Sequence, residues 1–151
     1  MAARNLKRKE KGMKITIKRA DYEILLTHAR TCAPKEACGL IGGIETTEGT
    51  REIRKVYLLT NLDDSPEHFT LDPKEQLKAV KDMRALGIGP LGNWHSHPAS
   101  PARPSEEDKR LAYDPGATYL ILSLEEERNP VLNAFHVEGG TARMEELEVV
   151  D

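Results

Sequence analysis

The chain has 151 residues, a hydrophobic content of 38% and a net charge of −3. This length is enough for one well-buried core and too short for two ordinary domains, so we expect a single domain. No apolar run is long enough to span a membrane, and the first residues lack the apolar core of a signal peptide, which predicts a cytoplasmic protein without a membrane partner. The two cysteines, Cys32 and Cys38, are too few for a disulfide framework and are expected to be reduced.

The charge is distributed unevenly along the chain. Residues 1–12 hold five basic side chains and one acidic one, a charge of +4, so the total of −3 leaves −7 for residues 13–151. Terminal segments of this composition are typically disordered. We therefore predict a disordered basic segment over residues 1–12 and one domain over residues 13–151, whose acidity argues against nucleic acid as a partner.

The order of apolar and polar residues predicts a mixed α/β fold. Strands are expected where apolar and polar residues alternate or form a short run between turns, and helices where apolar residues recur at helical spacing. In chain order the sequence predicts a strand over 14–18, a helix over 21–32, strands over 37–44 and 52–60, a helix over 73–86, a strand over 91–97, a helix starting at Ser105, and strands over 118–124, 131–138 and 143–149.

Capping residues mark the starts of two of these helices. Asp72 precedes Pro73, with Glu75 three positions after Asp72, and Gly87 is expected to end that helix. Ser105-Glu106-Glu107-Asp108 has the pattern of a capping box, with an acidic residue three positions after the cap.

The chain also carries His95-Ser96-His97-Pro98 shortly before Ser105. On a strand, His95 and His97 project from the same face, so both imidazoles can bind one metal ion. Asp108 would add a third ligand from the next element. Catalytic zinc is typically held by three protein ligands, which leaves a position for water, whereas structural zinc is closed by four. We therefore predict a catalytic site with one zinc ion per chain, and the alternative is that S-x-x-D is only a helix cap.

This pattern resembles the JAMM motif of MPN-type metalloproteases, in which H-S/T-H-P is followed by S-x-x-D, here with Ser105 seven residues after Pro98. The segment Pro34-Lys35-Glu36-Ala37-Cys38-Gly39-Leu40-Ile41-Gly42-Gly43 resembles the glutamate-bearing strand of the same family. The resemblance covers nearly the whole chain from about Met13 onward. It implies a cytidine-deaminase-like α/β fold, in which a central curved mixed β-sheet is flanked by helices.

The resemblance also implies a role for each site residue. His95, His97 and Asp108 would bind zinc, Glu36 would act as general acid and base, and Ser105 would help to stabilise the oxyanion. On the residues alone, Glu36 could instead be a solvated side chain between a helix and a strand, and Ser105 could serve only as a cap.

The neighbours of these residues are expected to be structural. Trp94 and Ser96 alternate with the two histidines along the strand, so they should face away from them. Cys38 would share a face with Glu36 and is expected to be a small buried residue rather than a ligand or a redox switch.

The resemblance implies hydrolysis of the isopeptide or peptide bond after the C-terminal Gly-Gly of ubiquitin or a ubiquitin-like protein. The interval from Asp114 to Thr118 holds only a Pro-Gly turn, so the chain lacks room there for the large insertion of chain-selective eukaryotic relatives. It looks closer to prokaryotic stand-alone members of the desampylase or sulfur-carrier-adduct hydrolase type. The expected partner is a small modifier or sulfur-carrier protein ending in Gly-Gly, with a lysine side chain or a free amino acid such as cysteine as leaving group, and homodimerisation stays open.

Two other classes of protein share parts of this pattern. A DNA-associated protein of the RadC type has a related motif, but such chains favour Asn between the histidines, where this chain has Ser96. A non-catalytic MPN scaffold normally lacks at least one of the five site residues, all of which are present here. His136-Val137-Glu138 matches the H-x-E of zinc deaminases, but neither cysteine is placed to form their P-C-x-x-C.

Overall fold

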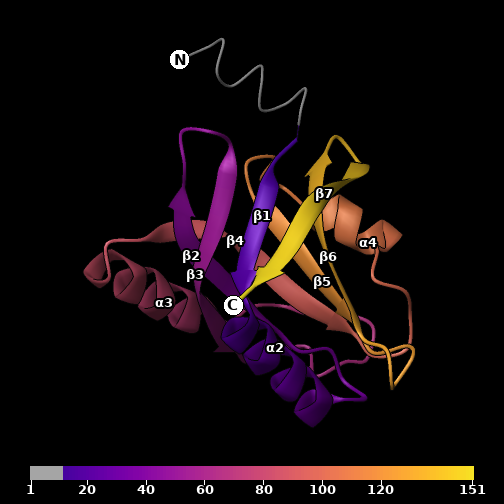
Figure 1. The fold of residues 1–151 in the computed structure, drawn as a ribbon. Helices are drawn as coiled ribbons and strands as arrows, with labels where there is room; N and C mark the ends of the chain where they lie inside the picture. The colour runs from indigo at the N-terminus through magenta and orange to yellow at the C-terminus, as the bar shows by residue number, and fades with distance from the viewer. Residues whose placement is uncertain (1–11) are drawn as a thin grey trace.

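The fold is seen in a computed structural model that describes residues 12–151 (Figure 1). The basic segment predicted for residues 1–12 therefore lies, apart from Gly12, outside the described residues. The elements are β1 (Lys14–Lys18), α2 (Arg19–Cys32), β2 (Cys38–Glu45), β3 (Thr50–Leu59), α3 (Pro73–Ala85), β4 (Gly89–His97), α4 (Glu106–Leu111), β5 (Thr118–Ser123), β6 (Val131–Glu138) and β7 (Thr141–Val150).

The predicted order of strands and helices is confirmed, with ends that differ from the prediction by at most two residues. The local capping chemistry explains why the helix boundaries were predictable. The carboxylate of Asp72 accepts a hydrogen bond from the N–H of Lys74, and α3 ends just before Gly87, which has a positive φ of 73°. Ser105 caps α4 as predicted.

The seven strands form one mixed sheet that closes on itself in the order β1-β3-β2-β4-β5-β6-β7. The pairs β1–β3, β1–β7 and β4–β5 are parallel, and the remaining neighbours are antiparallel. The predicted central curved mixed sheet is confirmed, and its curvature goes as far as a barrel. Figure 1 shows α3 and α4 on opposite sides of this sheet, as expected for flanking helices.

The largest apolar cluster joins α2 to the strands, with Leu25, Leu26 and Ala29 of the helix packed among buried strand residues. Burying a large apolar side chain stabilises a fold by about 1.5–3 kcal/mol, so this cluster dominates the stability of the domain. A second cluster lies under α3, and a third includes Ala102 and residues of β5 and β6. Among residues 12–151, the structure contains no helix with the length and apolar character needed to cross a membrane.

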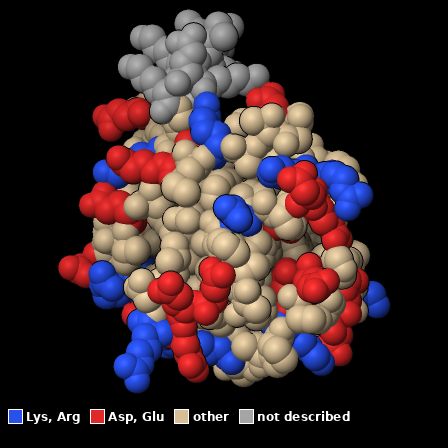
Figure 2. All heavy atoms as spheres, turned by 90° about the vertical axis from the view of Figure 1, so that its right-hand side faces the viewer, with Lys and Arg blue, Asp and Glu red and all other residues tan. Residues whose placement is uncertain are grey.

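The surface carries charges of both signs. On the face shown in Figure 2, the described residues present acidic and basic side chains interspersed around a largely uncharged centre. This differs from the continuous basic stripe typical of nucleic-acid-binding proteins.

Trp94 and Ser96 face away from the two histidines, as predicted. Trp94 is fully buried in the largest cluster, and its indole N–H donates to the carbonyl oxygen of Tyr57 at 3.0 Å. Gly39 makes this contact possible, because a β-carbon there would lie 1.7 Å from that carbonyl oxygen and 2.5 Å from the indole nitrogen. The glycine lets β2, β3 and the tryptophan ring approach closely.

We expect Gly39→Ala to lower the free energy of unfolding by about 1–3 kcal/mol or more, because the methyl group overlaps backbone that cannot move aside. Chemical denaturation measures the change. Gly89→Ala is the matched control, since a β-carbon at Gly89 would meet nothing within 4 Å. Equal stability of the two variants would show that the contact at Gly39 is not tight.

Candidate metal centre

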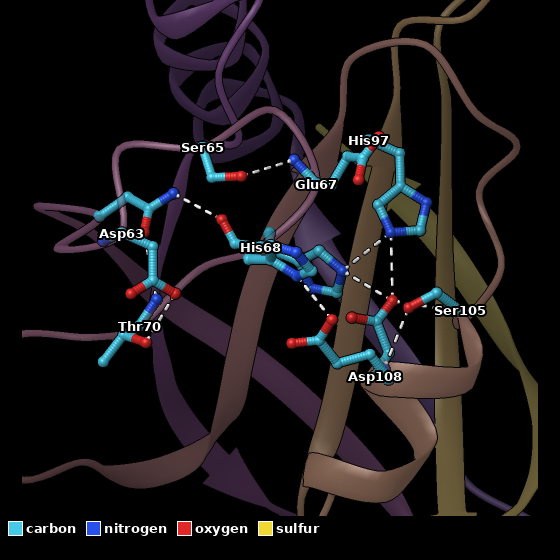
Figure 3. Close-up of polar contacts among 11 residues, drawn as sticks. Asp63, Ser65, Glu67, His68, Thr70, His97, Ser105 and Asp108 are labelled. Atoms are coloured by element: carbon cyan, nitrogen blue, oxygen red, sulfur yellow. Dashed lines mark hydrogen bonds and ion pairs between the residues drawn. The ribbon is translucent and has the colours of Figure 1, made fainter.

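Three side chains converge where β4 ends and α4 begins. His95 and His97 lie at the C-terminal end of β4, and Asp108 lies in the first turn of α4. The Nε2 atoms of the two histidines are 3.0 Å apart, and Oδ2 of Asp108 lies 3.2 Å from that of His95 and 3.1 Å from that of His97. Both imidazoles are buried, and Figure 3 shows the contact of His97 with Asp108. The three predicted ligand atoms are therefore brought together.

The spacing of these atoms fits a tetrahedral metal ion. Ligands held at about 2.0–2.1 Å from zinc in a tetrahedron are about 3.3 Å apart, close to the three distances observed. Two imidazoles and one carboxylate are also a donor set that zinc uses in catalytic sites. Among the described residues, this is the group of histidine, cysteine and carboxylate side chains positioned to hold a metal ion.

Contacts behind the ligands orient the two rings. Nδ1 of His97 lies 2.8 Å from the carbonyl oxygen of Pro101, so that nitrogen donates a proton and Nε2 is left to face the site. The ring of Phe69 stacks on His95, with 4.5 Å between centroids and 22° between planes. Burial lowers the pKa of His95, which favours the neutral imidazole that binds metals.

The Asp108 carboxylate carries negative charge into the site. Burial by itself would raise the pKa of Asp108. The hydrogen bonds with His95 and His97 outweigh the effect of burial and hold the pKa of Asp108 well below its usual range. Burial also opposes protonation of His97, yet its contact with Asp108 raises the pKa of that ring. The electrostatics therefore favour positive charge where the three side chains meet.

The capping box and the metal motif use the same residues. Oγ of Ser105 accepts a hydrogen bond from the N–H of Asp108 at 3.0 Å, and Oδ2 of Asp108 accepts one from the N–H of Ser105 at 2.9 Å (Figure 3). The two interpretations of S-x-x-D therefore hold together. The cap uses a lone pair of Oγ and leaves the hydroxyl hydrogen of Ser105 free to donate elsewhere.

Glu36 lies in the loop before β2, beside the ligands. Ala37, the residue after Glu36, forms two hydrogen bonds with Ser96. The Oγ of Ser96 accepts from the N–H of Ala37 at 2.8 Å, and the N–H of Ser96 donates to the Ala37 carbonyl oxygen at 2.9 Å. This pairing fixes Glu36 next to the strand that carries both histidines. Its side chain is 5% exposed, and Oε1 has no hydrogen-bond partner among residues 12–151.

The environment of Glu36 suits a group that gains and loses a proton. Burial raises the pKa of Glu36 to about 8, and nearby Asp108 and Glu107 act in the same direction, while His97 opposes them. A carboxyl group with a raised pKa in a site with a metal-ligand set is a typical general acid or base. The prediction for its catalytic role, like that for Ser105, stays a prediction.

The segment 60–72 between β3 and α3 borders the site, although the sequence predicted no site residue within it. Its backbone is organised by the amide of Asn61. Its Oδ1 accepts hydrogen bonds from the N–H of Asp63 at 3.0 Å and of Thr70 at 3.1 Å. Its Nδ2 donates to the carbonyl oxygens of His68 at 2.9 Å and Glu36 at 3.1 Å. One side chain therefore joins this loop to the segment that carries Glu36.

Two residues of the same loop, His68 and Phe69, contact the β4 and α4 residues around the predicted metal site. Phe69 stacks on His95, and Nδ1 of His68 forms an ion pair with Glu107 on α4. The only sequence signal was a phenylalanine in a mostly polar stretch, in a chain that has just two phenylalanines. Cys38, by contrast, is the small buried residue that was predicted, and burial raises the pKa of its thiol to about 12.

Comparison with known proteins agrees with this geometry. Residues 18–136 match the family described as prokaryotic homologues of the JAB domain, and the chain belongs to this family. The chain is similar to the CysO-cysteine peptidase of Mycobacterium tuberculosis, with 33% identity over 138 residues that cover 91% of this chain and 92% of the relative. It is also similar to the desampylase of Haloferax volcanii, with 33% identity over 104 residues that cover 66% of this chain and 73% of the relative.

A solved structure from Desulfitobacterium hafniense is 52% identical, with a TM-score of 0.84, and the match covers 91% of this chain and 93% of that one. The predicted family, fold class and enzyme class, a JAMM-type peptidase, are therefore confirmed. The relatives support neither the RadC-type nor the scaffold alternative.

We expect Asn61→Ala to destabilise the protein by about 0.5–1.5 kcal/mol for each hydrogen bond lost, because exposed and partly buried backbone groups of the loop lose their side-chain partner. Hydrogen exchange should become faster at the backbone amides of Asp63 and Thr70, which donate to the side-chain Oδ1 of Asn61. Asn129→Ala, at an exposed asparagine, is the control. Unchanged exchange in the Asn61 variant would mean that the loop is held by other contacts.

Proposed function

We propose that this protein is a zinc-dependent peptidase that cleaves the bond after the C-terminal Gly-Gly of a ubiquitin-like or sulfur-carrier protein. The observation that carries the proposal is the convergence of His95, His97 and Asp108 beside the buried carboxylate of Glu36. The names of two relatives, a CysO-cysteine peptidase and a desampylase, support hydrolysis of adducts of such carrier proteins.

In this proposal His95, His97 and Asp108 hold one zinc ion. Zinc, when bound, polarises a carbonyl group and lowers the pKa of a water molecule to about 7. Glu36 takes a proton from the attacking water and transfers it to the nitrogen of the departing group, since its Oε1 has no other partner among the described residues. The pairing of Ser96 with Ala37 keeps that carboxylate in place.

Ser105 supplies a hydrogen-bond donor to the substrate. Its oxygen already accepts from Asp108, so the hydroxyl hydrogen is available for the carbonyl oxygen that becomes negatively charged. Contacts of this type contribute about 2.7–4 kcal/mol to transition-state stabilisation.

An extended Gly-Gly tail is a suitable substrate because glycines let a peptide backbone come close to the reacting centre. The leaving group is either a lysine side chain or a free amino acid. The cytoplasmic location stays a prediction and homodimerisation stays open, and the proposed chemistry does not depend on either.

We expect the purified protein to bind one zinc ion per chain, measured by elemental analysis, and His97→Ala to lose it, because two ligands in a three-ligand site bind zinc far more weakly. His136→Ala is the matched control, since His136 lies on β6 and pairs with Glu138 outside the cluster. A parent protein that binds no zinc would contradict the proposal.

We expect the enzyme to release the adduct from carrier proteins of the same genome that bear cysteine or lysine after Gly-Gly, seen as a loss of intact mass beyond the second glycine. Glu36→Gln should lower kcat/KM by about 10²–10⁴-fold with zinc content unchanged, because a general acid and base is removed. Full turnover in this variant would remove Glu36 from the mechanism. Failure of the parent to cleave any adduct would contradict the function itself.

A further inference from the structure

A pocket opens directly beside the metal ligands His95 and Asp108. The loop 60–72, the start of α4 and the strands β4, β5 and β6 enclose it. Apolar and aromatic residues make up half of its lining, and the other half is polar or charged and includes Glu67 and Glu107 beside the metal-ligand set. Phe69, Asn93, Tyr119 and Ile121 are among the lining residues.

The pocket is built on the same sheet face as the metal centre. Asn93 lies two residues before His95 on β4, so both side chains project from one face. On the neighbouring strand, Asn93 is in register with Tyr119 and His95 with Ile121. A group bound at the metal centre is therefore in direct reach of the pocket.

Two residues that line this pocket, Asn93 and His95, each have a buried side-chain atom without a hydrogen-bond partner among residues 12–151, and in His95 this atom is Nδ1. Oδ1 of Asn93 is buried and makes no hydrogen bond within residues 12–151. The nearby hydroxyl of Tyr119 donates instead to the carbonyl of Asp114 at 3.0 Å, so the tyrosine presents its ring to the pocket. An unpaired buried amide oxygen costs about 1–3 kcal/mol, a cost that a bound ligand with a hydrogen-bond donor would remove.

We propose that this pocket receives the side chain of an amino acid released from the Gly-Gly end, and that Asn93 determines which side chain is accepted. The proposal rests on the function proposed above. Glycine has no side chain, so the two residues before the scissile bond cannot fill a pocket beside His95. The first side chain that can enter belongs to the residue after the bond.

The chemistry of the walls selects a short side chain with a donor. Apolar and aromatic groups such as Phe69 and Ile121 favour a small apolar or sulfur-containing body. The acceptor oxygen of Asn93 favours a thiol or hydroxyl at its end. Cysteine meets both conditions and serine the second, whereas alanine and the aliphatic stem of an isopeptide-linked lysine leave the amide unpaired.

The test compares kcat/KM for one carrier protein with cysteine, serine, alanine or an isopeptide-linked lysine after Gly-Gly. The parent enzyme should prefer cysteine and serine over alanine by about 3–10-fold, the effect of one hydrogen bond. Asn93→Leu should bring the cysteine-to-alanine ratio to about one, with zinc content unchanged. Asn129→Leu, the same change at an exposed asparagine, should keep the parent ratio.

Thermal unfolding separates this role from a structural one. Because Asn93→Leu removes an unpaired polar atom, its melting temperature should equal or exceed that of the parent. A parent enzyme without preference between cysteine and alanine would overturn the inference, as would an unchanged ratio in Asn93→Leu or a marked loss of stability. Each of these results leaves the proposed hydrolase intact, whereas the absence of cleavage of every adduct would instead contradict the function.

Discussion

The arrangement of the site depends on one oxygen atom, Oδ2 of Asp108. This oxygen accepts a hydrogen bond from the N–H of Ser105, which fixes the start of α4. It also faces the Nε2 atoms of His95 and His97. A helix of six residues has little stability of its own, so the capping box and the contact with β4 keep it in place. The same contacts define the helix and the metal-ligand set, which is why a short motif can specify both.

Glu36 shows how strand pairing completes a site that no single segment could form. It precedes β2, whose partner β4 carries the two histidines, and the double contact between Ser96 and Ala37 sets the distance between the two segments. Asn61 then joins the loop 60–72 to the same place. Glu36, the proposed proton-transferring group, and the proposed metal ligands thus lie on neighbouring segments of the fold.

The pocket at Asn93 shows a local conflict between stability and function. A leucine there would satisfy the apolar surroundings better than an amide without a partner, so the folded state alone does not explain this asparagine. Unsatisfied buried polar groups are rare in native proteins and call for an explanation. Recognition of a leaving group supplies one, and it would give the enzyme a means to distinguish amino-acid adducts from lysine-linked proteins.

The sequence by itself determined the features that depend on short-range periodicity. The two-residue repeat of a strand explains the spacing of His95 and His97, and the geometry of a helix cap explains that of Ser105 and Asp108. The convergence of the three predicted ligand side chains could therefore be predicted from the sequence. The ends of α3 were predictable for the same reason. The resemblance to a known family was needed to single out Glu36, which lies far from the ligands in the chain.

Only the tertiary structure decided what depends on long-range pairing. Closure of the sheet requires β1 to pair with β7, and nothing in either strand marks the other as its partner. Phe69 reaches His95 only because the loop 60–72 folds back over β4. Likewise, Oδ1 of Asn93 lacks a hydrogen-bond partner among residues 12–151 because of the residues that the fold packs around it. Such contacts join residues that are distant in the chain, and local patterns carry no information about them.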